Sequence, residues 1–542
     1  MKRSYPYVCG AIGPWQPSRL RRLLAASPGT SQIHADPGAT LWASSPLTSW
    51  QTENGRGWFW WPFADGGVPR SWRDAAEQRL AAGLVLDGGA AILHTCALGM
   101  QDLYITDVNG VRYFATDIDP LLAVIDGSLH SDWSAWASIL AIGGPIGPET
   151  PFEEVRRMEA ATGIRADKGQ LTVLSFTPSW VGLEPTGCEP ADVVEALRPH
   201  VPVAGGSRRT AITLSGGWDS RLVGALAAKR SRRPLLAWTT SIDDGLDHDL
   251  TLAGPVAAAL GAKHRVYVQD ADAYRTEREP VFERVQHQTY MHTCFMPLAR
   301  VLARRREPLL DGLAGDTLLR GYDTATIEAT SPDAQREALW TLIAIGDGRL
   351  VEDWFAPGVA ARLIEASRES FAAATRAFDG HPSAPRLGWL ATRAGRATAQ
   401  APLRLFAPET DVRMPFLHPD VIAVTQRVSL ATTKDGTFYR RILDAAMGAG
   451  AGDMPSSNDD GIYDGGARLP RRQRDPAALA EMIARIAADD TVVSLLGKEL
   501  LPALDDVNAR DQICTWNGPR GTLQWASMLA HWRNKYAHRL AA

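Results

Sequence analysis

Short apolar runs alternate with turn-forming residues over the first part of the chain, to about residue 185. The stretch Gln101–Asp119 has two such runs on either side of Asp107–Gly110, which predicts a β-hairpin. Leu171–Phe176 is a further strand-like run, whereas Asp132–Ala141 and Pro151–Ala161 are typical of helices. This part is therefore predicted to be mainly antiparallel sheet with a few helices.

A segment that contains Gly and Pro, Val181–Pro190, predicts a linker, and from Ala191 strand-like and helix-like segments alternate. This alternation predicts a parallel sheet covered by helices, in which ligands bind beyond the carboxyl ends of the strands. The predicted strands are Arg209–Leu214, Leu235–Thr240, Arg265–Gln269 and Pro308–Leu310, and the predicted helices are Arg221–Lys229, Leu250–Leu260 and one long helical region, Ala273–Arg306.

From about Ser331 the chain is predicted to be mainly helical, with amphipathic segments such as Pro476–Ala488 and Leu523–His538. Residues Gly448–Arg474, rich in Gly, Asp and Ser and then in Arg, predict a long loop. We therefore expect an α/β protein of two domains, residues 1–185 and 186–542, the second of which ends in a helical part.

Composition narrows the classes of function. Lys and Arg number 57 against 61 Asp and Glu, a formal net charge of −4, which argues against a dedicated nucleic-acid binder. No apolar run is long enough for a membrane helix, and the N-terminus lacks the apolar segment of a secretory signal. The five cysteines form no CxxC pair, so we expect free thiols and a cytoplasmic protein without nucleic-acid or membrane partners.

The strongest local motif is Leu214–Arg221, Leu-Ser-Gly-Gly-Trp-Asp-Ser-Arg, between a predicted strand and a predicted helix. Its two glycines let backbone N–H groups approach a polyphosphate, and the helix N-terminus adds the positive end of its dipole. Its serine hydroxyls can donate to phosphate oxygens, and Asp219 fits a magnesium ligand. The motif is not a P-loop, because no Lys follows the second Gly.

A tight turn with Asp219 as a helix cap is the alternative interpretation of this motif. A second acidic loop, Leu309–Asp316, argues against it, since this loop also follows a short apolar run. Loops after parallel strands open at the same edge of a sheet, so Asp219 and Asp316 are predicted to converge on one metal-bound pyrophosphate.

These motifs resemble those of the ATP-pyrophosphatase family, and of asparagine synthetases in particular. Ser215–Ser220 resembles the SGGxDS pyrophosphate loop, and Asp249–His264 is similar to the helix that leads into the third strand. Gly312–Tyr322 resembles the loop SGxGxDExFxGY, with Thr in place of the family's Glu. Asp411–Leu417 resembles the segment E-x-R-x-P-F-L, with Asp411 in place of Glu.

The resemblance implies a Rossmann-like (HUP) ATP-pyrophosphatase domain that follows a degenerate glutaminase-like (Ntn) domain of antiparallel sheet. It implies that Mg-ATP activates a carboxylate as an acyl-adenylate with release of pyrophosphate, and that an amine then forms the amide. The implied ATP-binding residues are Leu214, Ser215, Gly216, Gly217, Asp219, Ser220 and Gly315, and the implied Mg²⁺ ligands are Asp219 and Asp316. The family's late catalytic Lys falls near Arg440, with Lys434 as a competitor, and Asp411 is the third catalytic candidate.

The N-terminus distinguishes among family members. Asparagine synthetases that use glutamine begin with a nucleophilic Cys directly after Met1, because their glutaminase needs the free α-amino group of that Cys. Here Met1 is followed by Lys2, and the nearest matching cysteine is Cys9. We therefore expect Cys9 to be a buried core residue and the first domain to be catalytically silent.

Two branches of the family take the amine from the substrate itself: β-lactam synthetases and lasso-peptide cyclases. β-Lactam synthetases have a Tyr three residues before the second metal Asp, where this chain has Leu313. Trp218, Arg221, Met454–Asp459 and the Arg-rich Arg468–Arg474 look more like the cyclases. The favoured hypothesis is therefore a lasso-peptide cyclase, which joins an Asp or Glu side chain of a core peptide to its N-terminal amine and releases AMP and pyrophosphate.

Three alternatives remain open: an asparagine synthetase that uses ammonia or glutamine, a β-lactam synthetase-type ligase, and a non-catalytic peptide-binding scaffold. The cyclase hypothesis implies a linear core peptide as substrate. It also implies a leader-peptide-binding protein and a leader peptidase as partners, because the α-amine exists only after cleavage.

Overall fold

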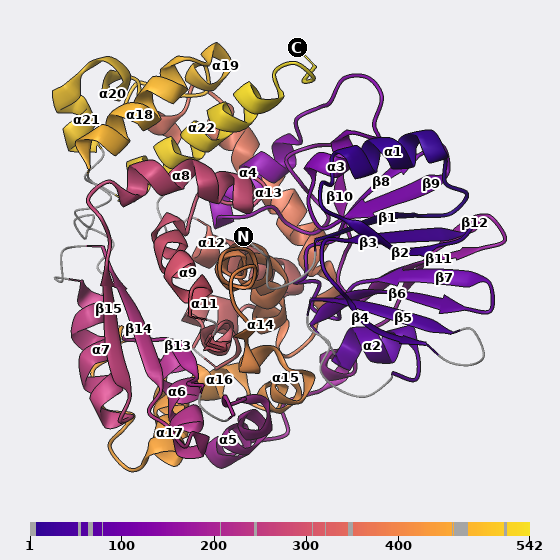
Figure 1. Ribbon diagram of the computed structural model, residues 1–542. Coiled ribbons are helices and arrows are strands. Elements are labelled where there is room, and N and C mark those ends of the chain that lie inside the picture. Colours follow the sequence, from indigo (N-terminus) through magenta and orange to yellow (C-terminus); the bar gives the residue numbers. More distant parts are fainter. Residues whose placement is uncertain are drawn as a thin grey trace. The chain divides into compact units, whose positions relative to one another are not determined.

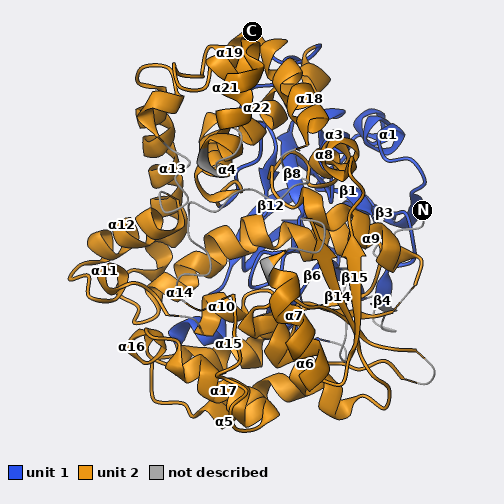
Figure 2. Cartoon of the chain, turned by 90° about the vertical axis from the view of Figure 1, so that its left-hand side faces the viewer, with its two compact units in different colours: residues 1–132, 147–182, 538–542 blue, residues 133–146, 183–537 orange. Residues whose placement is uncertain are grey.

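The computed structural model describes the chain apart from residues 1–6, 52–55, 63–68, 79, 206–207, 243–246, 306, 320, 345–350, 458, 460–474, 514–516 and 542. The chain forms two compact units (Figure 2). Unit 1 comprises Met1–Asp132, Gly147–Gly182 and His538–Ala542, and unit 2 comprises Trp133–Ile146 and Leu183–Ala537. The division predicted at residue 185 puts Trp133–Ile146 in the first domain, whereas helix α4 (Trp133–Ile142) packs against α13 (Val359–Thr375) in unit 2.

Unit 1 is built on two six-stranded antiparallel sheets (Figure 1). One has the order β10-β8-β9-β1-β3-β2 and the other β12-β11-β7-β6-β5-β4. The strands are β1 (Val8–Ile12), β2 (Ser31–Ala35), β3 (Ala39–Ala43), β4 (Thr48–Gln51), β5 (Gly57–Pro62), β6 (Ala81–Asp87), β7 (Ala90–His94), β8 (Tyr104–Val108), β9 (Val111–Ala115), β10 (Arg156–Arg157), β11 (Thr162–Asp167) and β12 (Gln170–Ser175). The helices of this unit are α1 (Pro17–Ala25), α2 (Trp72–Gln78) and α3 (Asp119–Leu122).

One apolar core joins the inner faces of these two sheets. Val8 and Leu41 from the first sheet and Trp61 and Leu93 from the second are buried in the same cluster. The predicted hairpin is confirmed as β8 and β9, and its turn residues Asn109 and Gly110 both have positive φ, as a tight two-residue hairpin requires. The architecture expected for this part of the chain is therefore confirmed.

The helix predicted at Pro151–Ala161 is wrong. The segment contains the two-residue edge strand β10, which pairs with β8. Thr150 Oγ1 donates hydrogen bonds to the carbonyl oxygens of Phe152 and Val155, and Glu154 accepts one from His130 N. These local bonds occupy the groups that a helix would have used.

Unit 2 contains a five-stranded parallel sheet of order β15-β14-β13-β16-β17. Its strands are β13 (Ala211–Thr213), β14 (Leu236–Ser241), β15 (Lys263–Val268), β16 (Leu309–Leu310) and β17 (Val412–Arg413), and helices α6 (Trp218–Arg230) and α7 (His248–Ala259) connect the first three (Figure 1). The parallel sheet expected from the sequence is confirmed. Because every strand runs the same way, the loops after β13 and β16 open at one edge.

The long helical region predicted at Ala273–Arg306 is in fact two helices, α8 (Ala273–Arg284) and α9 (Met296–Ala303). Gln286, His287 and His292 have positive φ between them, and a helix cannot continue through that conformation.

The rest of unit 2 is mainly helical, as expected. The helices are α5 (Pro190–Leu197), α10 (Gly315–Leu319), α11 (Thr324–Ile327), α12 (Pro332–Ile343), α14 (Ala384–Trp389), α15 (Pro419–Gln426), α16 (Leu430–Thr433), α17 (Thr437–Met447), α18 (Pro476–Ala487), α19 (Asp490–Val493), α20 (Pro502–Asp505), α21 (Val507–Ile513) and α22 (Asn517–Tyr536), with two π-helical stretches at Leu390–Thr398 and Ala401–Phe406. Within the described parts of the chain, no helix has the length and apolar character that crossing a membrane requires.

Candidate active site

The loop between β13 and α6 is tied to the sheet at its first residue. Leu214 N donates to the Trp238 carbonyl (2.8 Å), and Thr239 Oγ1 donates to the Leu214 carbonyl (2.7 Å). After Leu214 the chain turns, and Ser215 Oγ accepts a 3.1 Å hydrogen bond from Gly217 N while lying 3.2 Å from Ser220 Oγ. The loop therefore leads into the N-terminus of α6, and the N-terminal end of a helix is the end that attracts anions.

Glycine is required where this loop passes α7. A Cβ atom on Gly216 would lie 2.4 Å from Leu252 Cβ, so a larger residue would push the loop off α7. The glycine of the motif thus has a packing reason that is independent of any ligand.

The two acidic loops meet, as the sequence predicted. The backbone N–H of Asp316 donates a 2.8 Å hydrogen bond to Asp219 Oδ2. Gly315 makes this approach possible, because a Cβ there would lie 2.6 Å from Asp219 Cγ. Ala314, just before it, adopts a left-handed φ of 73°, which turns the second loop toward the first. The carboxylates of Asp219 and Asp316 are therefore neighbours at the carboxyl edge of the sheet.

Asp311 closes the gap between the two strands that carry these loops. Its Oδ2 accepts a 3.2 Å hydrogen bond from Thr213 Oγ1, and its Oδ1 accepts one from Leu313 N. Burial raises the pKa of the Asp311 carboxyl above its usual range. Asp311 thus links the ends of β13 and β16. The sequence did not predict a role for this residue.

Tyr439, on α17, is the central residue that the sequence analysis missed. Its hydroxyl donates a 2.8 Å hydrogen bond to Asp219 Oδ1, and its ring lies 5.2 Å from the ring of Trp218. Burial and then the negative charges of Asp219 and Asp316 raise the pKa of the Tyr439 phenol well above 10. The phenol therefore stays protonated and remains a donor. The one available signal was its position next to the predicted catalytic candidate Arg440.

The segment after α17 is anchored by a buried guanidinium on the loop between β13 and α6, called the phosphate loop below after its predicted role. Arg221 on α6 donates to the carbonyl oxygens of Met454 (3.0 Å) and Pro455 (2.7 Å). Ser456 Oγ in turn donates to the Gly216 carbonyl (3.0 Å). This part of the predicted loop Gly448–Arg474 is therefore a packed lining of the site, while Arg468, Arg471, Arg472 and Arg474 lie outside the described residues.

Arg440 is beside the loop but is held by an acid. Its Nη2 lies 2.7 Å from Asp459 Oδ1, and its guanidinium carbon lies 5.5 Å from the centre of the Trp218 ring. The structure thus brings Arg440 next to the residue that begins α6. Its catalytic role stays a prediction.

Lys434 lines a pocket of about 320 Å³. Asp316, Trp218 and Asp435 line the same pocket. The Lys434 amine lies 3.5 Å from Glu328, and 44% of its side chain is exposed. The other lining residues are Thr317, Gly321, Tyr322, Asp323, Leu342, Trp389 and Gly436.

Asp411 is not brought to the two acidic loops. It directly precedes β17, at the amino end of that strand, whereas Asp219 and Asp316 follow the carboxyl ends of theirs. Its carboxylate pairs with Arg413 at 2.8 Å and is about half exposed, at 48%. The described contacts therefore place Asp411 away from the phosphate loop, and its catalytic role stays a prediction.

The residues present fit Mg²⁺ and a polyphosphate. Asp219 and Asp316 are two neighbouring carboxylates that both act on the same buried phenol, so a divalent cation between them would offset their repulsion. The N–H groups at the start of α6 provide the complementary anion site. The residues could thus hold a metal-bound phosphate.

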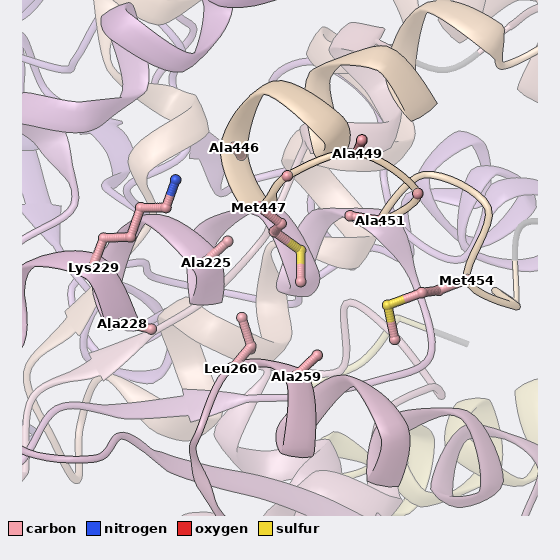
Figure 3. A pocket seen from close by; sticks show the side chains of 12 residues that line it. Ala225, Ala228, Lys229, Ala259, Leu260, Ala446, Met447, Ala449, Ala451 and Met454 are labelled. Atoms are coloured by element: carbon pink, nitrogen blue, oxygen red, sulfur yellow. The ribbon is translucent and has the colours of Figure 1, made fainter.

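A second pocket, of about 510 Å³, lies at the opposite end of α6 (Figure 3). Its walls are mainly alanines and the apolar side chains of Leu260, Met447 and Met454. The C-terminal end of a helix disfavours anions, so this pocket does not suit the phosphates of a nucleotide.

Comparisons with known proteins bear on unit 2. Residues 205–450 match the family model described as asparagine synthase. The match covers the parallel sheet, both acidic loops, Tyr439 and Arg440, and it supports an ATP-dependent amide-forming ligase in general. No curated protein matches the chain.

Two solved structures show a distant likeness. One, described as the allosteric regulatory enzyme of purine biosynthesis, is 11% identical, with 61% of this chain and 78% of that chain covered and a TM-score of 0.22. The other, glutamine phosphoribosylpyrophosphate amidotransferase from B. subtilis, is 10% identical, with 61% and 79% covered and a TM-score of 0.21. At these TM-scores neither structure supports an inference about this chain.

Cys9 is a buried core residue, as expected. It lies within β1, where it pairs with Trp42 on one side and Ala115 on the other, and its side chain is inaccessible to solvent. Burial raises the pKa of the Cys9 thiol to about 11, so the thiolate that a nucleophile needs is scarce at neutral pH.

Proposed function

We propose that this protein is an ATP- and Mg²⁺-dependent lasso-peptide cyclase. It adenylates an Asp or Glu side chain of a linear core peptide and joins that carboxyl carbon to the peptide's N-terminal amine. The family match supports the amide-forming ligase, and the sequence resemblance to cyclases favours the peptide substrate. On the same resemblance, a leader-peptide-binding protein and a leader peptidase act before it.

The observation that carries this proposal is the pocket that opens beside Asp316. It has aromatic walls, from Trp218, Tyr322 and Trp389, and two opposite charges, Lys434 and Asp435, side by side. Hydrogen bonds from Thr437 lower the pKa of the Asp435 carboxyl, which keeps it ionised. A cation and an anion on one wall suit a substrate that carries both a carboxylate and an amine, and aromatic walls suit the side chains of a peptide.

The reaction has two balanced steps. A carboxylate oxygen attacks the α-phosphorus of ATP, and the bond from that phosphorus to the bridging oxygen breaks, which releases pyrophosphate. The neutral N-terminal amine then attacks the acyl carbon, AMP leaves with the electron pair of the acyl–oxygen bond, and the amine proton passes to solvent. An α-amine has an ordinary pKa of about 7.7–8.0, so a useful fraction is neutral without a strong base.

The chain's own residues bind and orient the reactants. The positive end of the α6 dipole attracts the phosphate oxygens at the start of that helix, and Lys434 lines the pocket that would receive the carboxylate. Bound Mg²⁺ would be held by Asp219 and Asp316 and would neutralise charge on the phosphates. Tyr439 keeps the Asp219 carboxylate in place throughout. The main contribution to rate is then orientation of the amine and the activated carbon in one pocket.

The buried Cys9 favours an amine from the peptide over ammonia from glutamine. A glutaminase nucleophile must be accessible and readily ionised, and Cys9 is neither.

Mass spectrometry of the full chain with Mg-ATP tests the proposal. The substrates are linear peptides that have a free N-terminal amine and a single Asp or Glu. The position of this acidic residue differs from one peptide to the next. Loss of one water from a peptide, coupled to formation of AMP and pyrophosphate, is the expected result. The same peptides with an acetylated N-terminus should show adenylation without dehydration.

Two further reactions separate the alternatives. Asparagine from aspartate with ammonia or glutamine would replace the cyclase by an asparagine synthetase. If no substrate leads to ATP turnover, in the native chain or in Asp219→Ala, the non-catalytic scaffold is the remaining hypothesis. Thr432→Ala, at an exposed position on α16, serves as the control substitution.

A further inference from the structure

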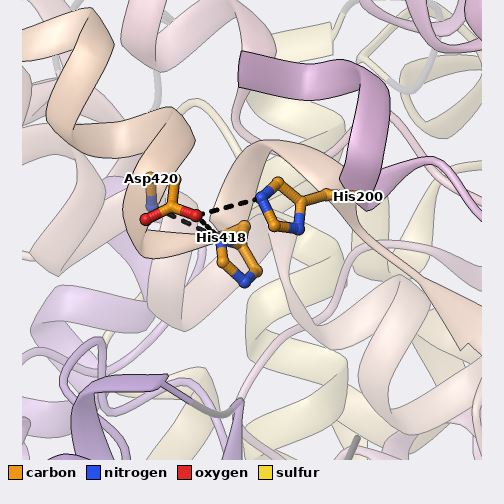
Figure 4. Close-up of side chains that lie close together, drawn as sticks. All are labelled: His200, His418 and Asp420. Atoms are coloured by element: carbon orange, nitrogen blue, oxygen red, sulfur yellow. Dashed lines mark hydrogen bonds and ion pairs between the residues drawn. The ribbon is translucent and has the colours of Figure 1, made fainter. Parts of the chain in front are cut away.

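Three side chains with metal-binding atoms converge away from the candidate active site (Figure 4). His200 ends the short 3-10 helix Arg198–His200, and His418 and Asp420 lie at the start of α15. Asp420 Oδ2 is 3.3 Å from His200 Nε2 and 3.5 Å from His418 Nδ1. All three ligand atoms lie within 4.8 Å of one another.

These separations match the spacing of ligands around zinc. Ligand atoms about 2.0–2.2 Å from a tetrahedral zinc ion lie about 3.3–3.6 Å from each other. Both nitrogen–oxygen separations, 3.3 and 3.5 Å, fall in that interval. His200 Nε2 is buried and, among the described residues, has no hydrogen-bond partner. Its close neighbour is Asp420 Oδ2, and an ion between the two atoms would be a ligand partner for both.

The chemistry of the three groups also favours a metal ion. Imidazole nitrogen and carboxylate oxygen are both common ligands of zinc, and the carboxylate of Asp420 would supply negative charge beside the ion. Asp420 is 69% exposed, which leaves a position open for a water ligand.

Binding requires a small rearrangement of the rings. They are stacked, with centroids 3.3 Å apart and planes at 15°, and they must tilt apart so that both nitrogens face one ion. His418 Nδ1 now accepts a 3.3 Å hydrogen bond from Asp420 N, a long contact that coordination would replace. The partial exposure of His418 and Asp420 gives room for this movement.

A second cluster, Glu283, His287 and His531, is less suited to a cation. His287 Nε2 and His531 Nδ1 already share a 2.9 Å hydrogen bond. Glu283 is paired with Lys535 at 2.5 Å, and this ammonium group would repel a metal ion. In the His200 cluster, by contrast, no Lys or Arg pairs with Asp420 among the described contacts.

We propose that His200 Nε2, His418 Nδ1 and the Asp420 carboxylate bind one Zn²⁺ ion, which fastens the end of the Arg198–His200 turn to the start of α15. Two imidazole nitrogens and one carboxylate oxygen form the ligand set, and a water molecule completes the tetrahedron. The site is independent of the proposed ligase reaction and holds whether or not that reaction is correct.

Metal titration of the full chain tests the site. The protein is stripped of metal with a chelator, desalted and titrated with Zn²⁺ in competition with a chromogenic chelator. Excess Mg²⁺ is present so that it occupies the carboxylates of Asp219 and Asp316. Co²⁺ serves as a spectroscopic probe, because a tetrahedral site with nitrogen ligands gives strong visible absorption. One tight equivalent of Zn²⁺ and this absorption are expected for the native chain.

Substitutions then assign the ligands. His200→Ala and His418→Ala should each lose the tight equivalent, with an effect larger than the about 10–100-fold that outer partners of a metal site contribute. Asp420→Asn, at an exposed position, keeps the test valid if a histidine variant fails to fold, and it should weaken binding and abolish the cobalt spectrum. His34→Ala is the matched control, because His34 Nε2 also contacts an aspartate, Asp36, at 2.9 Å.

The control should bind zinc as the native chain does. A native chain that takes up no tight zinc overturns the proposal. So does a folded His418→Ala or Asp420→Asn protein with native stoichiometry and affinity.

Discussion

The hydroxyl of Tyr439 donates a 2.8 Å hydrogen bond to Oδ1 of Asp219, across 220 residues of sequence. The backbone N–H of Asp316 holds the other oxygen of the same carboxylate. Asp219 is therefore positioned by two donors from two separate elements, α17 and the second acidic loop. The carboxylate that the sequence marks as a metal ligand is oriented by a residue that the sequence does not mark.

Tyr439→Phe should lower turnover chiefly through Mg²⁺. Without the hydroxyl, the Asp219 carboxylate loses one of its fixed donors, so the Mg²⁺ concentration for half-maximal activity should rise about 10–100-fold, the effect typical of outer partners of a metal site. A titration of initial rate against Mg²⁺ measures this. Tyr7→Phe is the control, since the Tyr7 hydroxyl shares a 3.0 Å hydrogen bond with Ser27 Oγ in unit 1. An unchanged Mg²⁺ profile in Tyr439→Phe would show that the contact does not orient the ligand.

The same phenol should make stability depend on alkaline pH. The pKa of Tyr439 is raised in the folded chain above its ordinary value of about 10, so its stabilising contribution is complete below pH of about 10. Above that pH the unfolded chain loses the proton first, and stability falls by about 1.4 kcal/mol per pH unit until the folded group also titrates. Urea unfolding between pH 9 and 11.5, roughly the range around the ordinary pKa of tyrosine, should therefore show a smaller loss of unfolding free energy per pH unit for Tyr439→Phe than for the native chain. Parallel slopes for the two proteins would contradict the buried contact.

Gly315→Ala should damage the site more than the fold. The new Cβ would lie 2.6 Å from Asp219 Cγ and 2.8 Å from Phe416, so the Asp219 side chain must move. We expect a loss of about 1–3 kcal/mol in unfolding free energy, as for overpacking, and an activity loss of about 100-fold or more from the misplaced ligand. Gly182→Ala, where a Cβ meets nothing within 4 Å, should stay within about 0.5 kcal/mol and keep full activity. Equal behaviour of the two variants in urea unfolding and rate assays would refute the close approach.

Arg221→Lys should loosen the segment that lines the phosphate loop. Lysine cannot reproduce the fork that reaches both the Met454 and Pro455 carbonyls, so at least one buried acceptor loses its donor. The expected cost is about 1–3 kcal/mol in chemical denaturation. Arg441→Lys, at an exposed pair with Glu189, should change stability by less than about 0.5 kcal/mol. Faster proteolysis at residues 451–457 in Arg221→Lys alone would link the cost to this segment.

Lys434→Met tests which cation serves the reaction. Lys434 lines the pocket beside Asp316, whereas Arg440 is paired with Asp459. Removing the amine should reduce kcat by about 10²–10³, the effect of removing one preorganised charge, with a smaller change in KM for ATP. Glu328→Gln removes the acid that contacts Lys434 and leaves the amine, so it should keep kcat within a few-fold. A larger kcat loss in Arg440→Met than in Lys434→Met would assign the role to Arg440 instead.

Local pattern predicted most of the elements that position the site. The hairpin β8–β9 and the strands β13 to β15 follow from alternating apolar runs and turn residues, because these are encoded within a few neighbouring positions. Two predictions differ from the structure: the helix at 151–161 is wrong, and the helical region at 273–306 is interrupted. The first segment instead follows the side-chain hydrogen bonds of Thr150 and its pairing with β8, and the second contains left-handed residues between α8 and α9, neither of which the apolar periodicity shows.

By itself, the sequence determined the alternation that makes a parallel sheet, the two glycine-bearing acidic loops, and hence the convergence of Asp219 with Asp316 at one sheet edge. Strand direction and loop position suffice for that inference, since parallel strands present their following loops together. Only the tertiary structure decided that Tyr439 holds Asp219, that Arg221 pins residues 454–456, and that His200 meets His418 and Asp420. These contacts join residues hundreds of positions apart, and their geometry depends on how helices pack, which no local pattern of side chains encodes.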